Sequence, residues 1–352
     1  MRHAGGRVRV YDSQPGSAIA EFAADVGHYL QQQPRQLPSR YLYDPLGSAL
    51  FDAICQLPWY RLTAAEMRLL RTHGRDILSH AGPPARVVEL GSGNGDKLAA
   101  LVAAGRIPAV PLGVHLIDIS PAALATASRA LAVFDHVRVV GHEADYENGL
   151  RNLAREIRPP GPTLIVFLGS NIGNYDPPGA AALLREVRQA LRPGDHFLIG
   201  VDLTKPEADL QLAYDDPLGV TAAFNRNLLV RINRELAGDF DLAAFTHAVH
   251  WNAADSRIEM RLVSTKAQTV TIPLAGLELT FAAGEFIWTE SSYKYEAQTV
   301  ARLLAAAGFD VRQQWFDDEA RFALTLAGVA AEWPNLPPVV PSPITPPRRI
   351  DG

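Results

Sequence analysis

Short apolar runs recur through the first two thirds of the chain, separated by stretches rich in Ala and Leu. The runs occupy residues 86–90, 114–118, 137–141, 163–168 and 196–202. Each has the length of a strand, and the stretches between them have the composition of helices. Strands that alternate with helices form parallel sheets with helices on both faces. The pattern therefore predicts an α/β fold built on such a sheet.

The rhythm changes after residue 202. A helical region at about 206–235 is followed by the strand-like stretches DLAAFTHAVHW, RIEMRLVS and QTVTIPL. These are typical of an antiparallel meander, so we expect a second, α+β region. A helix at 297–308 then leads to two strand candidates, FDVRQQWF and RFALTLAG, joined by DDEA. An antiparallel hairpin at the end of a parallel sheet resembles the usual finish of a Rossmann-like methyltransferase.

Composition narrows the classes of partner. The longest apolar runs fall short of the roughly 20 residues of a membrane helix, and the start of the chain lacks the apolar core of a secretory signal. We therefore expect a cytoplasmic protein that binds no membrane. A net charge of -5, without a long basic stripe, favours a small-molecule partner over nucleic acid. The absence of coiled-coil heptads gives no reason to expect a large assembly, so a monomer is predicted.

No metal site is expected. Cys55 is the single cysteine, so a metal would have to rely on histidines and carboxylates, and no disulfide can form within the chain. His247 and His250 are three residues apart on a predicted strand and should face opposite sides. We interpret both as structural or surface histidines.

A helix start is predicted before the first apolar run. Thr63 and Glu66 have the spacing of a capping box, in which each side chain satisfies a backbone N–H at the start of a helix. We therefore expect a helix through the following residues MRLLRTHGRDIL.

The stretch VVELGSGNGDK places a glycine-rich loop after the first predicted strand. Glycines at 91, 93 and 95 let backbone approach a ligand closely where a Cβ would block it. The dinucleotide fingerprint requires a further glycine at position 96, where this chain has Asp96. With the acidic Glu89 near the strand end, the loop looks more like a site for S-adenosylmethionine than for NAD.

Three more groups follow strand ends at the same edge of the sheet. Asp118 can accept both hydroxyls of a ribose, and Asp145 with Tyr146 can hold an adenine. Helix caps or solvated turns are the alternative role for each acid. Lys97 begins a helix, where a cation gains nothing from the helix dipole, so a bound carboxylate such as that of a methionine moiety would explain it.

These residues resemble those of the L-histidine Nα-methyltransferases, which make hercynine on the route to ergothioneine. The resemblance runs from about Tyr41 to Leu326. The motifs that carry it are YLYDPLGSALFDAICQLPWY, VVELGSGNGDK, FLGSNIGNY, AYDDPLGVTAAFNRNLL and FAAGEFIWTESSYKY. One departure lies at residues 59–66, where the family commonly reads EYYPTRTE and this chain reads WYRLTAAE.

The resemblance implies that the loop FLGSNIGNY is where cofactor and substrate meet. Gly169 and Asn174 would lie near the backbone atoms of an amino acid, and Tyr214 would bind its carboxylate together with Asn174. Asn174 offers both a donor and an acceptor, although an asparagine there can also cap the next helix.

The resemblance also implies a pocket for the imidazole ring. Glu290 and Ser292 would bind its nitrogens, and as alternate strand residues they share a face. Met260 would pack beside the ring, or simply belong to an apolar strand face. Tyr43 and Tyr60 would close over the substrate, with Tyr43 near the reacting amine.

The implied reaction is transfer of methyl groups to the neutral α-amine of histidine until the nitrogen is quaternary. Tyr43 and Asn174 are the residues we expect at the reacting nitrogen. A tryptophan or other aromatic amino acid is the alternative substrate, and a more remote alternative is an NAD-dependent oxidoreductase or nucleotide-binding module. Glu290 and Met260 favour histidine.

The domains follow from this assignment. Residues 63–203 and 294–328 are expected to form the S-adenosylmethionine-binding domain, a Rossmann-like class I methyltransferase sheet. Residues 10–62 and 204–293 are expected to form an α+β substrate-binding domain. The proline-rich residues 332–352 are expected to form a mobile tail.

Overall fold

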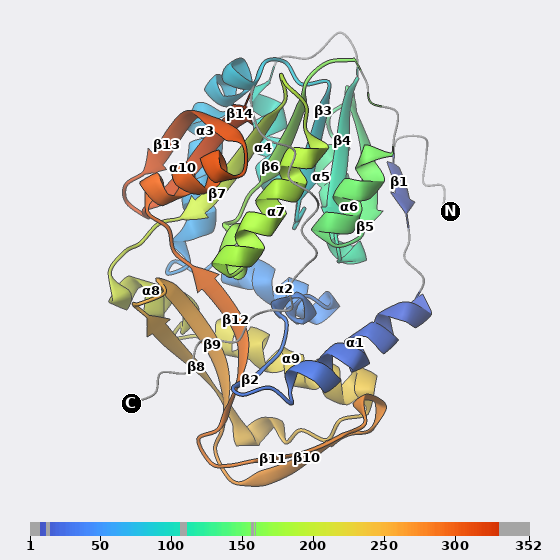
Figure 1. The fold of residues 1–352 in the computed structure, drawn as a ribbon, viewed down its shortest axis with the longest axis vertical. Coiled ribbons are helices and arrows are strands. Elements are labelled where there is room, and N and C mark those ends of the chain that lie inside the picture. The colour runs from blue at the N-terminus through green and yellow to red at the C-terminus, as the bar shows by residue number, and fades with distance from the viewer. Residues whose placement is uncertain (1–7, 12–14, 106–110, 156–157, 159, 331–352) are drawn as a thin grey trace.

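The computed structural model describes residues 8–11, 15–105, 111–155, 158 and 160–330. Figure 1 shows a large sheet with its helices in one half of the molecule and a smaller sheet with α1 and α9 in the other. Helix α2 lies between the two halves. No helix among the described residues is both long and apolar enough to cross a membrane.

The large sheet has eight strands in the order β1-β5-β4-β3-β6-β7-β14-β13. All neighbours are parallel except β7–β14 and β14–β13. The Rossmann-like sheet with an antiparallel terminal hairpin is thus confirmed. Its strands are β1 (Val8–Tyr11), β3 (Arg86–Leu90), β4 (Leu112–Asp118), β5 (Val137–Glu143), β6 (Thr163–Phe167), β7 (His196–Asp202), β13 (Phe309–Asp317) and β14 (Phe322–Val329).

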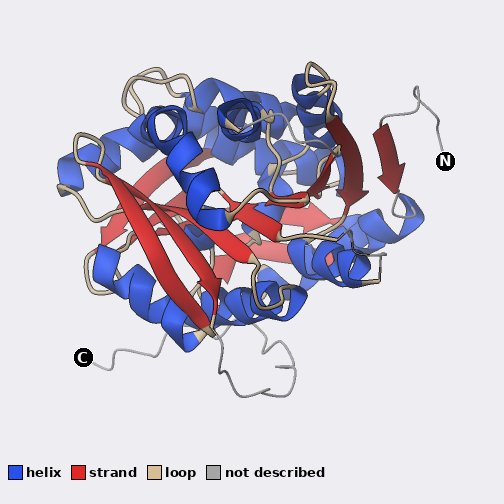
Figure 2. Cartoon of the chain, turned by 90° about the horizontal axis from the view of Figure 1, so that it is seen from above, coloured by secondary structure: helices blue, strands red, loops and turns tan. Residues whose placement is uncertain are grey.

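Helices cover both faces of this sheet, as Figure 2 shows from above. Alternate strand residues point to opposite faces, so Val87 packs with α3, α4 and α5, whereas Val88 packs with α6, α7 and α10. Burial of each such aliphatic side chain contributes roughly 1.5–3 kcal/mol. The helices are α3 (Arg61–Ala81), α4 (Asp96–Ala104), α5 (Pro121–Leu131), α6 (Tyr146–Ala154), α7 (Pro177–Ala190) and α10 (Ala297–Ala306).

The smaller sheet has the order β2-β12-β9-β8. The meander β8–β9–β12 is antiparallel, and β2, from the N-terminal segment, runs parallel to β12. A separate hairpin joins β10 and β11. The bounds are β2 (Arg35–Gln36), β8 (Phe245–Asn252), β9 (Arg257–Ser264), β10 (Gln268–Ile272), β11 (Leu277–Phe281) and β12 (Phe286–Tyr293).

The remaining helices pack around the smaller sheet. Helix α9 contacts β8, and α2 packs on α9. Their bounds are α1 (Pro15–Tyr29), α2 (Pro45–Ile54), α8 (Glu207–Tyr214) and α9 (Val220–Leu236), with short 3-10 turns η2 (Ser39–Leu42), η3 (Asn171–Asn174), η4 (Leu242–Ala244) and η5 (Pro273–Ala275).

Residues 203–295, which carry β8, β9 and β12, leave and rejoin the large sheet at neighbouring points. Leu203, just after β7, forms a parallel bridge with Tyr295, just after β12. Tyr295 N–H donates to the Asp202 carbonyl at 3.1 Å, and Thr204 N–H donates to the Tyr295 carbonyl at 3.0 Å. Entry to and exit from residues 203–295 are therefore held side by side.

Two sequence expectations differ from the structure, and one lies outside it. Strand β1 pairs with β5 in the large sheet, although residues from 10 onward were expected with the substrate region. The capping box is wrong, because α3 begins at Arg61 and the Glu66 side chain turns away from the helix start. Residues 332–352, expected as a mobile tail, lie outside the described residues. The division into two domains remains a proposal.

Candidate functional site

A cleft of about 1790 Å³ opens along the carboxyl ends of the parallel strands. All five residues predicted to bind the cofactor line it: Gly91, Lys97, Asp118, Asp145 and Tyr146. They lie at or soon after the carboxyl ends of β3, β4 and β5, because parallel strands end at the same sheet edge. The fold therefore places all five predicted residues around one cavity.

Gly91 and Gly95 are positions where the loop has little room for a side chain. The φ of Gly91 is +79°, and a Cβ added there would lie 2.8 Å from the Tyr146 hydroxyl and 2.9 Å from Asn171 Nδ2. Gly95 also has a positive φ of +82° and would meet the Ala127 backbone at 2.6 Å. The backbone thus forms a cradle that close packing keeps free of side chains.

Replacing Gly91 with alanine is expected to weaken S-adenosylmethionine binding about 10- to 100-fold, because the new methyl group displaces Tyr146 and Asn171 and strains the loop. Isothermal titration of both proteins measures this. Gly82→Ala is the matched control, since its φ is +71° but nothing lies within 4 Å of the added Cβ. Equal affinity of Gly91→Ala and wild type would contradict the cradle.

The acids near the cleft differ in what they bind. Asp118 accepts hydrogen bonds from Ser120 N–H at 2.8 Å and Ser92 Oγ at 3.2 Å, and burial raises the pKa of its carboxyl group. Asp145 caps α6, accepting from the backbone N–H of Asn148 at 2.7 Å and from its side chain at 2.8 Å. Asp145 is therefore a helix cap, as the alternative role predicted, and it also lines the cleft.

Lys97 already has a partner in the fold. Its ammonium lies 2.7 Å from Glu66 Oε2, and both oxygens of Glu66 accept from Gly169 N–H, at 2.8 and 3.0 Å. Glu66 is fully buried, and Gly200 of β7 leaves the space that its carboxylate fills. This ion pair accounts for a cation at the start of α4 without a bound carboxylate. It also joins α3, α4 and the loop after β6.

Glu89 lies at the base of the cleft. Its side chain is buried, and Oε2 has no hydrogen-bond partner within the described residues. Burial raises the pKa of its carboxyl group well above the usual value, although Lys97 opposes the shift. A buried oxygen left open in a ligand cleft fits a donor supplied by the cofactor.

An inner chamber of about 30 Å³ adjoins the cleft. All the residues predicted to bind or act on the substrate line it: Tyr43, Tyr60, Gly169, Asn174, Tyr214, Met260, Glu290 and Ser292. Tyr43, Gly169, Asn174 and Glu290 also line the large cleft, so the two spaces share a wall. The chamber alone is far smaller than a typical ligand pocket of roughly 300–1,000 Å³, so a bound amino acid must widen it or extend into the cleft.

The conformation of the loop after β6 explains why its sequence is rich in Gly, Ser and Asn. Gly169 has a φ of +80°, and Ser170 adopts a φ of +57° while its Oγ accepts from Asp202 N–H at 2.9 Å. A Cβ at Gly173 would lie 2.8 Å from the Tyr293 carbonyl. The loop is thereby pressed against β12. Asp176, not Asn174, caps the following helix, so the capping alternative for Asn174 is wrong.

Glu290 and Ser292 extend from β12 into the chamber, as expected for alternate residues of one strand. Glu290 pairs in register with Met260 of β9, which is almost fully buried. Burial raises the pKa of Glu290 to about 7, and the charge of Lys294 opposes this shift. The carboxyl group therefore changes its charge near neutral pH.

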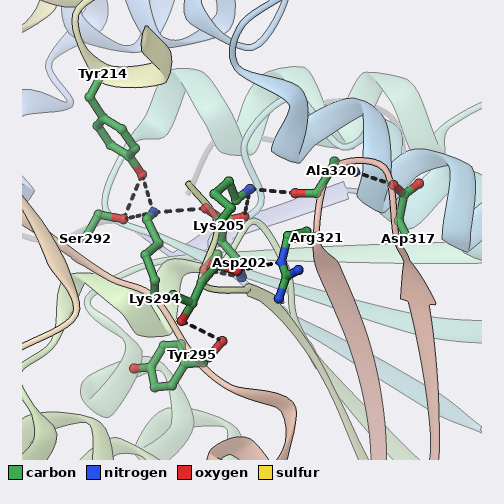
Figure 3. Close-up of polar contacts among 11 residues, drawn as sticks. Asp202, Lys205, Tyr214, Ser292, Lys294, Tyr295, Asp317, Ala320 and Arg321 are labelled. Carbon is green, nitrogen blue, oxygen red and sulfur yellow. Dashed lines mark hydrogen bonds and ion pairs between the residues drawn. The ribbon is translucent and has the colours of Figure 1, made fainter. Parts of the chain in front are cut away.

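Tyr214 and Ser292 form a hydrogen-bonded pair over a buried lysine. Their hydroxyl oxygens are 2.7 Å apart, and Lys294 Nζ donates to each at 2.8 Å (Figure 3). Lys294 also lies 3.0 Å from Asp202 Oδ2. Tyr214 is anchored from behind, because His247 Nε2 contacts its carbonyl oxygen at 2.9 Å.

Two further tyrosines form the wall nearest α2. Tyr43 packs edge-on against Phe51 and Phe224, with centroid distances of 5.5 Å, and Tyr60 packs edge-on against Tyr214 at 6.0 Å. Burial raises the pKa of both phenols well above the usual value. Neither side chain is a phenolate near neutral pH, so Tyr43 can pass on a proton but cannot act as a resident base.

Sequence reasoning missed two residues of this site. Glu66 was interpreted as a helix cap, since its partner Gly169 is 103 residues away. Lys294 was overlooked in the motif ESSYKY, although it follows Glu290 and Ser292 at strand spacing, which is a usable signal. His247 and His250 lie on β8, with His247 turned inward and His250 exposed. The part of the chain that the structure describes contains no cluster of potential metal ligands.

Comparison with known proteins identifies the family. A sequence profile described as "Histidine-specific methyltransferase, SAM-dependent" matches residues 22–329. A histidine N-alpha-methyltransferase from Mycolicibacterium smegmatis is 40% identical over 312 residues, covering 88% of this chain and 96% of that protein. One from Mycobacterium tuberculosis is 41% identical over 304 residues, covering 86% and 93%.

A more distant relative represents the alternative substrate. An L-tryptophan methyltransferase from Psilocybe serbica is 27% identical over 317 residues, covering 82% of this chain and 87% of that protein. The family profile names S-adenosylmethionine as the cofactor, so it does not support the nicotinamide alternative. The chain belongs to the S-adenosylmethionine-dependent, histidine-specific methyltransferase family.

Proposed function

We propose that this protein methylates the α-amino nitrogen of L-histidine until it is quaternary, which yields hercynine, the first step of ergothioneine biosynthesis. The observation that carries the proposal is the inner chamber, in which an acid and a hydroxyl from one strand face a small space that opens on the cofactor cleft. The histidine N-alpha-methyltransferases at 40 and 41% identity support it.

Histidine fits the polarity of the chamber. Its ring has two nitrogens, and Glu290 and Ser292 are two polar groups that reach one face. Indole has a single N–H and a larger ring, so it would leave one of these groups without a partner. Met260 lies beside Glu290 on the neighbouring strand and adds an apolar group to the same chamber.

The chain's residues divide the task between cofactor and substrate. The loop from Gly91 with Asp118 and Tyr146 would hold S-adenosylmethionine, which when bound supplies an electrophilic methyl group on a sulfonium. Gly169 and Asn174, on the shared wall, would place the substrate amine toward it. Tyr214 would bind the substrate carboxylate together with Asn174. Positioning of this kind contributes much of the rate enhancement in a displacement reaction.

The nitrogen attacks only as a neutral amine, because its lone pair forms the new N–C bond. The N–H proton must leave after each of the first two transfers, and the ammonium proton before the first. Burial keeps Tyr43 protonated, so its hydroxyl would relay protons to water by accepting one and donating another. A cytoplasmic location and a monomeric state remain part of the proposal.

Mass spectrometry tests the function directly. Purified protein is incubated with S-adenosylmethionine and either histidine or tryptophan, in parallel with Glu290→Ala. Mass gains of one to three methyl groups on histidine, reduced by the substitution, are expected. Methylation of tryptophan alone would overturn the histidine assignment while leaving the family unchanged.

Tyr43→Phe is expected to lower kcat at least about 10-fold with little change in histidine affinity, because only the proton relay is lost. Steady-state kinetics and equilibrium binding measure the two effects. Tyr41→Phe is the matched control, since its hydroxyl donates to Asp25 at 2.8 Å outside the chamber. An unchanged kcat in Tyr43→Phe would assign the proton path to another route.

A further inference from the structure

Lys294 lies directly behind the proposed substrate chamber without lining it. The residue follows β12, and its side chain is 0% exposed. Figure 3 shows its ammonium between the hydroxyls of Tyr214 and Ser292 on one side and Asp202 on the other. A buried lysine is costly unless it is paired, so its presence needs a reason.

All three N–H donors of Lys294 are in use. They point to Tyr214 and Ser292, each at 2.8 Å, and to Asp202 at 3.0 Å. Burial alone would lower the pKa of Lys294, but Tyr214 and Asp202 raise it above the usual value, so the ammonium stays charged. Asp202 also binds Lys205 Nζ at 2.6 Å. Two ammonium groups thus share this carboxylate, and only that of Lys294 also donates to the hydroxyl pair.

The number of hydroxyl hydrogens limits how many hydrogen bonds the Tyr214–Ser292 pair can donate to a ligand. Both oxygens accept from Lys294, and they are 2.7 Å from each other, so one hydroxyl donates to the other. Each hydroxyl has one hydrogen. A single O–H therefore remains for the chamber, and it comes from Tyr214 or from Ser292 but not from both.

The charge of the substrate decides which hydroxyl keeps that hydrogen when substrate binds. Hydrogen bonds to a charged acceptor are roughly twice as strong as neutral ones. In the proposed complex the anionic group is the substrate carboxylate at Tyr214. Tyr214 then donates to the carboxylate, Ser292 donates to Tyr214, and the free lone pair of Ser292 accepts from a ring N–H.

We propose that Lys294 is a positioning residue for substrate recognition, which makes Tyr214 a donor to the substrate carboxylate and Ser292 an acceptor for the ring. This inference rests on the proposed function and extends it to a residue that does not touch the substrate. Its charge would act through the two hydroxyls on the anionic end of the amino acid.

Lys294→Met is expected to weaken histidine binding about 10- to 100-fold, because charge-assisted hydrogen bonds are lost. Affinity for S-adenosylmethionine should stay within about 3-fold of wild type, since the cofactor loop is untouched. Histidinol has no carboxylate, so its affinity should change much less than that of histidine. Isothermal titration of each ligand, with melting temperatures alongside, measures these effects.

Lys205→Met is the matched control. It removes the other ammonium from Asp202, but Lys205 contacts the Ala320 carbonyl rather than the hydroxyl pair. Histidine affinity should therefore change less than about 3-fold. Lys294→Gln keeps two N–H donors without the charge and should fall between wild type and Lys294→Met. If Lys294→Met does not fold, the histidine affinity of Lys294→Gln tests the role of the charge instead.

Three outcomes would overturn the inference. Wild-type affinity for histidine in folded Lys294→Met, or in Lys294→Gln if only that variant folds, would show that the charge is not used. Equal weakening for histidine and histidinol would indicate a merely structural role. Failure of the wild-type protein to bind histidine at all would overturn the proposed function as well, which separates it from the first two outcomes.

Discussion

Glu66→Gln is expected to lower kcat/KM for methyl transfer about 100-fold, because displacement of a positioning loop by about 1 Å costs that much. Glu66 holds Gly169 N–H with both oxygens and pairs with Lys97. A glutamine carbonyl can replace Oε2, but its N–H₂ group then lies at the Oε1 position against Gly169 N–H, and the negative charge opposite Lys97 is lost. The loop and Lys97 then lose their common anchor. Steady-state kinetics with histidine and S-adenosylmethionine measures the loss.

The same substitution should also destabilise the fold. Removing one partner of a buried ion pair costs about 3–5 kcal/mol, and Lys97 is 21% exposed, which places the expected cost at the lower end. Glu66→Leu with Lys97→Met removes both charges and should recover much of the stability without recovering activity. A variant Glu66→Gln with wild-type kcat/KM would exclude Glu66 as the anchor of the loop.

Glu290→Gln is expected to make the protein more stable at pH 8 by up to about 3 kcal/mol while weakening histidine binding. Burial raises the pKa of Glu290 to about 7 from an ordinary 4.5. The folded state therefore binds the proton more tightly than the unfolded state. The resulting destabilisation is absent below about pH 4.5, grows up to pH 7 and is complete above it. Glutamine removes it.

Denaturant unfolding at pH 4.5 and pH 8 checks this prediction. The difference between Glu290→Gln and wild type should appear only at the higher pH. Glu278→Gln, an exposed position on β11, should show no such difference. A stability gain of equal size at both pH values would mean that ionisation of Glu290 is not its cause. A group that costs stability at the pH of function is typical of a binding site.

The sequence predicted those parts of the fold that depend on local pattern. The strands at residues 86–90 and 196–202 match β3 and β7 residue for residue, because buried parallel strands are continuous apolar runs. Strand β1 escaped prediction, since a four-residue edge strand has little pattern of its own. Its position is decided by pairing with β5, more than 100 residues later.

The site shows the same limit. The residues that line the cleft and chamber could be selected from motifs, because strand ends and strand alternation bring them together. The bonds between them could not. A Thr-x-x-Glu pattern favours a helix cap, yet the Glu66 carboxylate accepts a hydrogen bond from Gly169 N–H. The space for this carboxylate depends on the missing side chain at Gly200. Likewise, the ion pair of Lys294 with Asp202 could not be predicted, because Asp202 ends a strand of the other sheet.

The joined entry and exit of residues 203–295 give the molecule a modular construction. The chain leaves the large sheet after β7 and returns beside it at Tyr295. The two ends of this segment can therefore stay adjacent whatever the number of residues between them. Insertions, deletions or the transplantation of this segment from a relative would alter ring recognition and leave the methyl-donor half intact. A family could diversify its substrates in this way by exchanging one segment.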